Sequence, residues 1–166
     1  VAGTNLVVQP REGKGSMEFS ITVLPGDGIG PEVIGEAVKA LDAVGSRFGH
    51  HFDLRYGRIG GNAIEHFGTA LPDDTAELCE GSEAILFGAV GGPKWDGLDA
   101  TVRPEDGILA VRKGLGLFAN LRPVKVFPAI VSSSPVKAEL LEGVDMMIVR
   151  ELTGGLYFSR PKRRWS

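Results

Sequence analysis

The sequence predicts an α/β fold, an open and mainly parallel sheet with helices on both faces. Apolar runs of strand length alternate along the chain with segments of helical period. One run, 84–90, lacks polar alternation, as is typical of a strand covered on both faces. With 166 residues, 43% of them hydrophobic, the chain is long enough to bury a core.

Each element of the first half follows from local pattern. Apolar residues at helical spacing follow Pro31, a residue suited to the start of a helix, and Gly49 suits its end. Asp73 or Asp74 is expected to cap a later helix. The expected elements are a strand over 19–24, a helix over 31–48, a strand over 51–58, a short helix over 63–67, a helix from 73 or 74, and the strand over 84–90.

The second half is predicted with fewer signals. A polar loop is expected over 94–106, a helix over 107–117, and strands over 124–127 and 144–149. Hairpin character over 153–158 gives way to a basic, aromatic end, which we interpret as an exposed loop.

Composition and charge disfavour several classes of protein. Lys and Arg total 18 against 21 Asp and Glu, so a globally basic nucleic-acid binder is not expected. No segment approaches the ~20 apolar residues that span a bilayer, so no membrane partner is expected either. Cys79 has no second cysteine to pair with, and we expect a small buried hydrophobe in a reducing compartment, the cytoplasm.

Two glycine-rich turns follow predicted strands. The turn over 26–30 lacks the dinucleotide-binding fingerprint because its sixth position is Pro31, so a structural turn is favoured over a direct phosphate contact. In the turn over 91–97, Lys94 offers charge and Trp95 a stacking face. A ligand-binding loop and a surface loop anchored by its tryptophan both remain open there.

Three arginines and one tyrosine form a further candidate group: Arg112, Arg122, Arg150 and Tyr157. Guanidinium groups that converge on one cleft suit a dicarboxylate, whereas a single arginine is more often a solvated surface charge. The histidines have no acidic or cysteine partner at metal-ligand spacing. Neither the Gly-x-Ser-x-Gly motif of serine hydrolases nor a phosphate-binding P-loop is present.

Four segments in order, 24–32, 88–96, 117–123 and 150–158, resemble the β-decarboxylating dehydrogenases. This family comprises isocitrate and isopropylmalate enzymes, and the isopropylmalate group is the more similar. The resemblance covers about residues 19–161 and implies that family's fold, which is not a Rossmann fold. It also implies a flexible N-terminal extension over 1–18, the first lobe over 19–118 and the start of a second, incomplete lobe over 119–166. An ordered N-terminal strand is the alternative for the extension.

The resemblance implies NAD-dependent oxidative decarboxylation of 3-isopropylmalate to 2-oxoisocaproate, a step of leucine biosynthesis, by a homodimer that uses Mg or Mn. Arg112, Arg122 and Arg150 match the arginines that bind the carboxylates of the 2-hydroxy dicarboxylate. Tyr157 matches the catalytic acid, and Ile108 and Leu109 suit the isopropyl group. The loop along the nicotinamide end of NAD comprises Gly92, Pro93, Lys94, Trp95, Asp96, Gly97, Leu98, Asp99, Ala100, Thr101, Val102, Arg103, Pro104 and Glu105.

Members of that family run to roughly twice this length. Their catalytic lysine and metal-binding aspartates match nothing here, so we expect no metal ligand in this chain and an N-terminal half that is inactive alone. A tartrate, malate or isocitrate type of decarboxylating dehydrogenase is the alternative, because one or two methylenes discriminate by only ~1–3 kcal/mol. A non-catalytic anion-binding fragment is the other alternative.

Overall fold

The computed structural model describes residues 15–95, 101–152 and 154. The chain divides into two compact units, Val1–Ile108 and Leu109–Ser166. Most of the predicted extension over 1–18 lies outside the described residues, so its flexibility stays a prediction.

The first unit contains a parallel three-stranded sheet in the order β2-β1-β3. Its strands are β1 (Glu18–Gly26), β2 (His51–Tyr56) and β3 (Ala84–Ala89). Val23 of β1 lies opposite Tyr56 on one side and Leu86 on the other. Because each strand runs in the same direction, the carboxyl ends of all three meet at one edge of the sheet.

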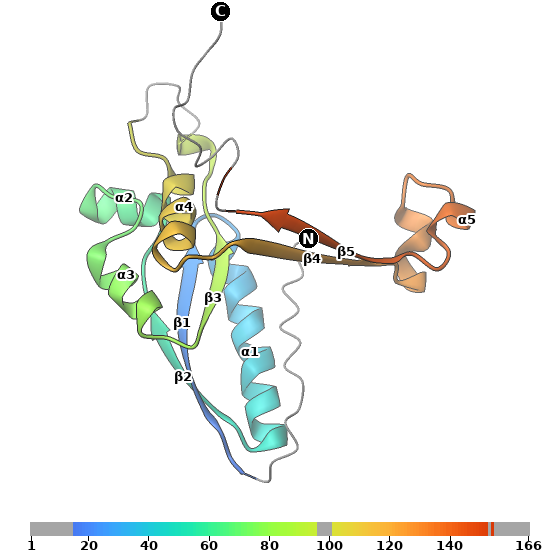
Figure 1. The fold of residues 1–166 in the computed structure, drawn as a ribbon, viewed down its shortest axis with the longest axis horizontal. Helices are drawn as coiled ribbons and strands as arrows, with labels where there is room; N and C mark the ends of the chain where they lie inside the picture. The colour runs from blue at the N-terminus through green and yellow to red at the C-terminus, as the bar shows by residue number, and fades with distance from the viewer. Residues whose placement is uncertain (1–14, 96–100, 153, 155–166) are drawn as a thin grey trace, which may run out of the picture. The chain divides into compact units, whose positions relative to one another are not determined.

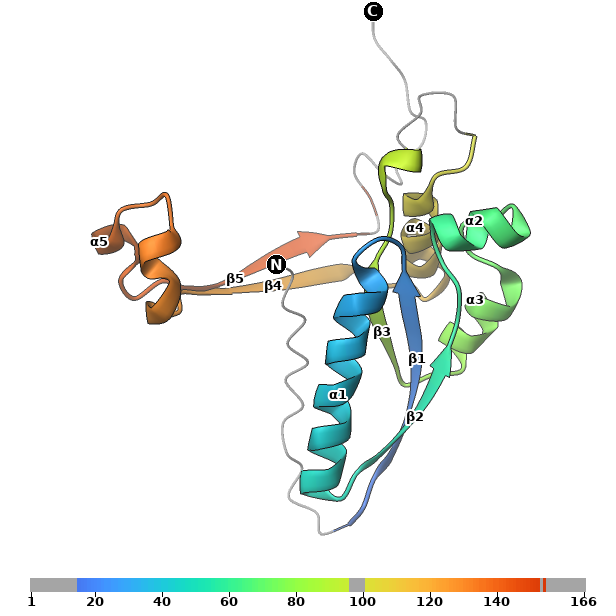
Figure 2. The ribbon, with the colours of Figure 1, turned by 180° about the vertical axis from the view of Figure 1, so that it is seen from behind.

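Helices cover both faces of this sheet, as the sequence predicts. The strands lie between α1 (Gly30–Phe48) on one side and α2 (Gly61–Phe67) and α3 (Asp73–Glu80) on the other (Figure 1), and the reverse view shows the same arrangement (Figure 2). On the α1 side, Ile21 and Val23 of β1 pack with Ile34 of α1 to form a buried core cluster. This burial is the main stabilising contribution to the layer.

The predicted limits of α1 are confirmed within one residue, but its predicted apolar stripe is only partly buried. Gly49 ends the helix in the left-handed conformation, with φ of 72°, and its N–H donates to the Gly45 carbonyl at 2.8 Å. Val44 and Phe48 are 41% and 63% exposed. Helical period therefore identified the helix correctly, although Val44 and Phe48 near its end are less buried than Ile34 near its start.

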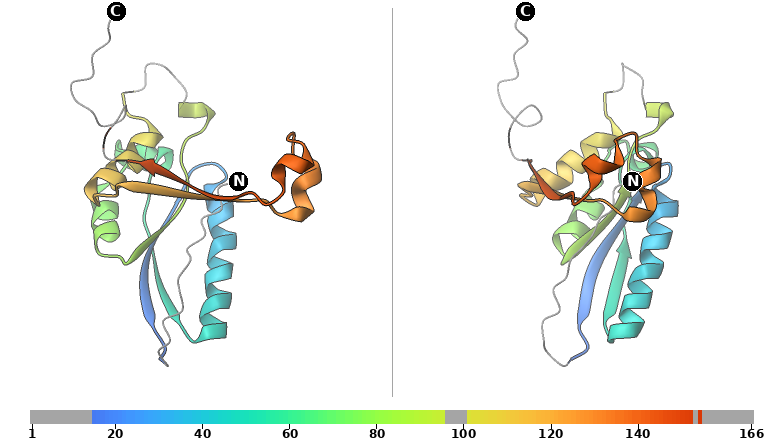
Figure 3. Two further views of the ribbon diagram at one scale, coloured as in Figure 1. Left: turned by 45° about the vertical axis from the view of Figure 1, so that its right-hand side comes forward. Right: turned by 90° about the vertical axis from the view of Figure 1, so that its right-hand side faces the viewer.

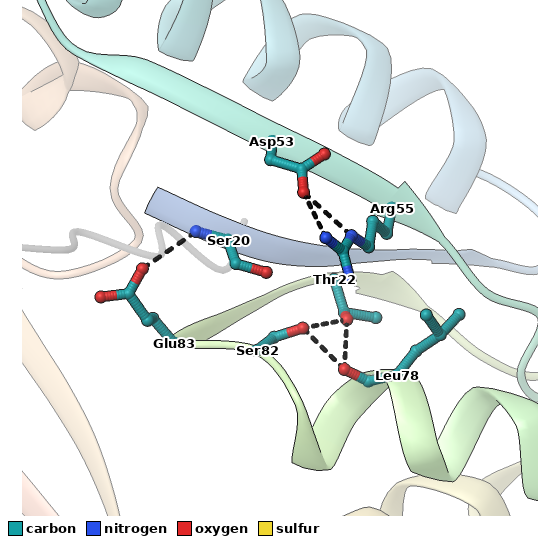
Figure 4. Close-up of polar contacts among 7 residues, drawn as sticks. All are labelled: Ser20, Thr22, Asp53, Arg55, Leu78, Ser82 and Glu83. Carbon is teal, nitrogen blue, oxygen red and sulfur yellow. Dashed lines mark hydrogen bonds and ion pairs between the residues drawn. The ribbon is translucent and has the colours of Figure 1, made fainter. Parts of the chain in front are cut away.

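The other face of β1 carries a buried polar network (Figure 4). Thr22 is fully buried, and its hydroxyl donates to the Leu78 carbonyl of α3 at 2.9 Å. The Ser82 hydroxyl lies 2.6 Å from the same carbonyl and also contacts the Thr22 hydroxyl, so its single hydrogen is shared between these two acceptors. The end of α3 is thus fastened to the central strand by side-chain hydrogen bonds rather than by apolar contact alone.

The second unit contains an antiparallel pair, β4 (Ala119–Lys125) and β5 (Asp145–Glu151), and η2 (Pro128–Ser133) and α5 (Ala138–Leu141) lie in the connection between the two strands (Figure 3). The predicted strand over 124–127 was misplaced, because β4 begins at Ala119 and contains Pro123. A strand with one partner accommodates proline, which needs no ladder partner on its open side.

Three further local predictions need correction. Helix α4 (Pro104–Gly114) begins three residues before the predicted start, because the Asp106 carboxylate accepts the Arg103 N–H at 2.8 Å and closes the first turn. Pro72 is the N-cap residue of α3, so neither Asp73 nor Asp74 caps it. The short helices η2 and α5 were not predicted, since each is too short to show a helical period.

The Thr22 network predicts a loss of stability on removal of one hydroxyl. Thr22→Val should lower the free energy of unfolding by about 1–2 kcal/mol, because the Ser82 hydroxyl loses a buried partner. Thr69→Val, at an exposed position, is the matched control and should change little. Denaturation by urea measures both, and equal stabilities for the two variants would contradict the role given to the network.

Candidate active site

The carboxyl edge of the sheet is formed by two turns that pack directly against each other. After β1, Gly26 and Gly28 have φ of 74° and 56°. The Asp27 N–H donates to the Ala89 carbonyl at the end of β3, at 2.7 Å. A Cβ atom on Gly26 would lie 1.9 Å from the same carbonyl oxygen, so only glycine fits. This packing supports the structural role that the sequence favoured for the first glycine turn.

The Asp27 side chain joins three segments at this edge. Its Oδ2 atom accepts the N–H of Gly61 at 2.7 Å and that of Gly91 at 3.0 Å. Its Oδ1 atom accepts the N–H of Asn62 at 2.7 Å. Sequence reasoning treated Asp27 only as a turn residue, because its partners lie 34 to 64 residues away. The sequence offered one signal for this role, an acidic residue between two glycines of a turn. A carboxylate at such a position accepts hydrogen bonds from nearby N–H groups.

The second turn, after β3, leaves glycine backbone open beside a carboxylate. Gly91 has φ of 102°, and a Cβ atom there would lie 3.0 Å from Oε1 of Glu105. Among the residues that the structure describes, nothing lies within 4 Å of the corresponding position at Gly92. No side chain of the described residues therefore covers the backbone of Gly92 at that position.

Trp95 is held against α2 by two contacts of the η1 turn (Pro93–Trp95). A Cβ atom on Gly61 would lie 2.2 Å from the Trp95 Nε1 atom, so the indole edge occupies the space a side chain would fill. Lys94 forms an ion pair with Glu65 of α2, and its Nζ lies 5.3 Å from the centre of the Trp95 ring. These contacts anchor the tryptophan, and whether the loop also binds a ligand stays a prediction.

In the second unit, strand register brings two of the predicted arginines to one face. Asn120 lies opposite Arg150, and Arg122 lies opposite Ile148. Paired residues share a face, and so do residues two apart, so Arg122 and Arg150 project from the same side of the pair. The Arg122 Nε atom donates to the Asn120 Oδ1 atom at 2.7 Å, which orients its guanidinium along that face.

That face has two positive charges and no acidic residue between them. The positions paired on it hold Asn120, Arg122, Val124, Met146, Ile148 and Arg150. Arg122 is exposed and Arg150 is half-buried. The planar guanidinium group suits carboxylates in general, because a carboxylate can accept two hydrogen bonds from one of them.

The other predicted site residues are placed individually. Ile108, Leu109 and Arg112 are half-buried on α4. Pro104 and Glu105 form the start of that helix, which Thr101, Val102 and Arg103 precede. The predicted residues Asp96, Gly97, Leu98, Asp99, Ala100 and Tyr157 lie outside the described part of the chain. Gly91 belongs to the first unit and the three arginines belong to the second, so the convergence of the arginines beside Gly91 stays a prediction.

Cys79 is the buried hydrophobe that the sequence predicted, since it is 4% exposed. Burial raises the pKa of its thiol, and the nearby Glu80 carboxylate raises that pKa further. The thiol therefore stays protonated near neutral pH, and a protonated, buried thiol is a poor nucleophile.

Within residues 15–95, 101–152 and 154, no group of three or more His, Cys, Asp or Glu side chains could hold a metal ion. None of the described helices is both long enough and apolar enough to cross a bilayer.

The parallel sheet between helices and the glycine turns at its carboxyl edge define an α/β protein, and comparison with known proteins identifies its family. Residues 20–166 match the model of the isocitrate/isopropylmalate dehydrogenase family. The chain belongs to this family.

Curated relatives with more than half of the aligned residues identical are 3-isopropylmalate dehydrogenases. That of Geobacillus kaustophilus is 58% identical over 146 residues, which are 88% of this chain and 39% of the relative. Those of Dehalococcoides mccartyi strain 195 and Bacillus subtilis are each 54% identical over 90% of this chain and 41% of the relative. The chain thus spans about two-fifths of the length of the relatives it matches.

Solved structures of the same family share the fold. Isocitrate dehydrogenase from Methylococcus capsulatus matches with a TM-score of 0.65 and 31% identity, over 84% of this chain and 36% of that one. A β-decarboxylating dehydrogenase from Thermococcus kodakarensis matches with a TM-score of 0.58 and 35% identity, over 80% of this chain and 33% of that one. The predicted open α/β sheet and the predicted family are both confirmed.

The contact between Gly61 and Trp95 predicts a spectroscopic change. Gly61→Ala should displace the indole and shift its fluorescence to longer wavelength, because the added Cβ needs the space of the Nε1 atom. Gly35→Ala is the matched control, since Gly35 lies exposed in α1 with nothing within 4 Å of its Cβ position. The measurement uses a background in which Trp95 is the only tryptophan, and an unshifted Gly61→Ala spectrum would refute the packing.

Proposed function

We propose that the protein containing this chain is an NAD-dependent 3-isopropylmalate dehydrogenase of leucine biosynthesis. The observation that carries the proposal is the identity of more than half of the aligned residues to curated enzymes of that name. A cytoplasmic homodimer belongs to the same proposal. So does the division into a first lobe over 19–118 and the start of a second over 119–166.

Substrate carboxylates are proposed to bind at the arginines. Arg122 and Arg150 offer planar donor groups on one face of the β4–β5 pair, and the Asn120 amide fixes one of them. Arg112 is proposed to join them from α4. A bidentate pair holds a carboxylate in direction as well as in place, which aligns the hydroxyl carbon for oxidation.

The cofactor loop is proposed to be Gly92 to Glu105. The described part of this loop fits a nicotinamide ring, because Gly92 is open to close approach and Glu105 lies beside Gly91. A bound NAD would supply the acceptor for the hydride of the hydroxyl-bearing carbon of the substrate. This chain would provide the backbone against which the ring lies and would exclude side chains from that position.

Two further roles follow from the family resemblance. Tyr157 is proposed to give its proton to the enol carbon after decarboxylation. Ile108 and Leu109 are proposed to contact the isopropyl group, which their apolar side chains would shield from water.

Mg or Mn belongs to the proposal for the whole protein, but the residues described here do not form a site for it. The donors are expected outside this chain, and no role of the arginines or of the glycine turns depends on the metal.

An assay of NAD reduction tests the proposal directly. The full-length protein with Mn should reduce NAD with 3-isopropylmalate, and only weakly with isocitrate, malate or tartrate. The 166-residue chain alone should be inactive, because the family's lysine and metal-binding aspartates match nothing in it. No activity in the full-length protein, or a preference for isocitrate, would overturn the substrate assignment.

Arg122→Lys should reduce kcat/KM for 3-isopropylmalate by roughly one to two orders of magnitude. A planar pair of hydrogen bonds to a carboxylate is replaced by a point charge, and a hydrogen bond to a charged group contributes roughly 1.5–3 kcal/mol. Arg47→Lys, at the exposed end of α1, is the matched control and should leave kcat/KM unchanged. Wild-type efficiency in both variants would show that Arg122 binds no carboxylate.

A further inference from the structure

The Asp27 carboxylate makes an unusual set of contacts for a turn residue. It accepts three backbone N–H groups, at distances of 2.7, 2.7 and 3.0 Å. Two of them belong to the first residues of α2, which has no side-chain cap of its own. The third belongs to Gly91, where the proposed cofactor loop leaves β3.

We propose that Asp27 is a positioning residue for the dinucleotide loop, and this inference rests on the proposed function. Asp27 does not touch the cofactor in this account. It fixes the Gly91 amide relative to the start of α2, and therefore sets the direction in which Gly92 and Pro93 leave the sheet.

Segment 91–95, the first turn of the loop, is held by contacts at both of its ends. Asp27 holds Gly91 at one end, and α2 holds Trp95 and Lys94 at the other through Gly61 and Glu65. Since Gly61 donates to Asp27 and also receives the Trp95 ring, the carboxylate places both ends of the turn at once. Loss of the carboxylate therefore frees the segment 91–95 as a whole.

An isosteric change cannot keep all three hydrogen bonds. The asparagine side chain has one acceptor oxygen, and its amide nitrogen would face an N–H group in either orientation. Position 60 must stay glycine beside this carboxylate, because an added Cβ atom there would lie 2.5 Å from Oδ2 of Asp27. Asp27→Asn is thus a small change that removes one or two of the three contacts.

The test measures both backbone exchange and kinetics in the full-length protein. Asp27→Asn should accelerate hydrogen exchange at the amides of Gly61, Asn62 and Gly91, and leave the amides of β1 and β2 unchanged. It should raise KM for NAD about tenfold, the effect of losing one hydrogen bond to a charged group, while KM for 3-isopropylmalate stays within about twofold. Asp53→Asn is the matched control, since Asp53 forms an ion pair with the exposed Arg55 of the same strand, β2, and it should change none of these values.

Each other outcome is decisive. Unchanged exchange at these amides would show that the Asp27 carboxylate does not hold them in place. Faster exchange with an unchanged KM for NAD, or with equal rises in both KM values, overturns the positioning role and leaves a structural one. A wild-type protein that reduces no NAD refutes the proposed function instead, and the exchange data then decide whether Asp27 holds the two segments.

Discussion

The carboxylate of Asp27 is the interaction on which the carboxyl edge of the sheet depends. The first N–H groups of any helix lack partners within the helix, and those of α2 find theirs in this side chain. Negative charge there also complements the helix dipole. Because one oxygen serves both α2 and Gly91, the geometry of three separate segments is set by a single group.

The close approach of three backbone segments to this carboxylate requires glycine at the positions around it. A strand end, a helix start and a loop can share one side chain only if their backbones approach within hydrogen-bond distance. Side chains at Gly26 and Gly60 would meet the Ala89 carbonyl and the Asp27 carboxylate. The glycine turn after β1 thus serves close backbone packing, which accounts for its mismatch to the dinucleotide-binding fingerprint.

Local pattern predicted most of the first unit, and long-range contacts account for what it missed. The strands and α1 carry their own period, so their limits were nearly right. The role of Asp27 depends on partners up to 64 residues away, and no local spacing encodes it. For Arg122 and Arg150 the residue type suggested an anion site, but only the register of β4 and β5 places them together, and the proline inside β4 hid that strand.

The proposed general chemistry and the proposed choice of substrate depend on different features of this chain. The proposed carboxylate binding rests on strand register and on the fork geometry of arginine, so it would be shared by any 2-hydroxy dicarboxylate. Choice among such acids is proposed to fall to Ile108 and Leu109, where apolar contact discriminates by only ~1–3 kcal/mol per methylene. The paired hydrogen bonds of one arginine to a carboxylate are worth at least as much. Substitutions of Ile108 or Leu109 should therefore exchange substrates with modest losses, whereas substitutions of Arg122 or Arg150 should weaken the binding of all of them alike.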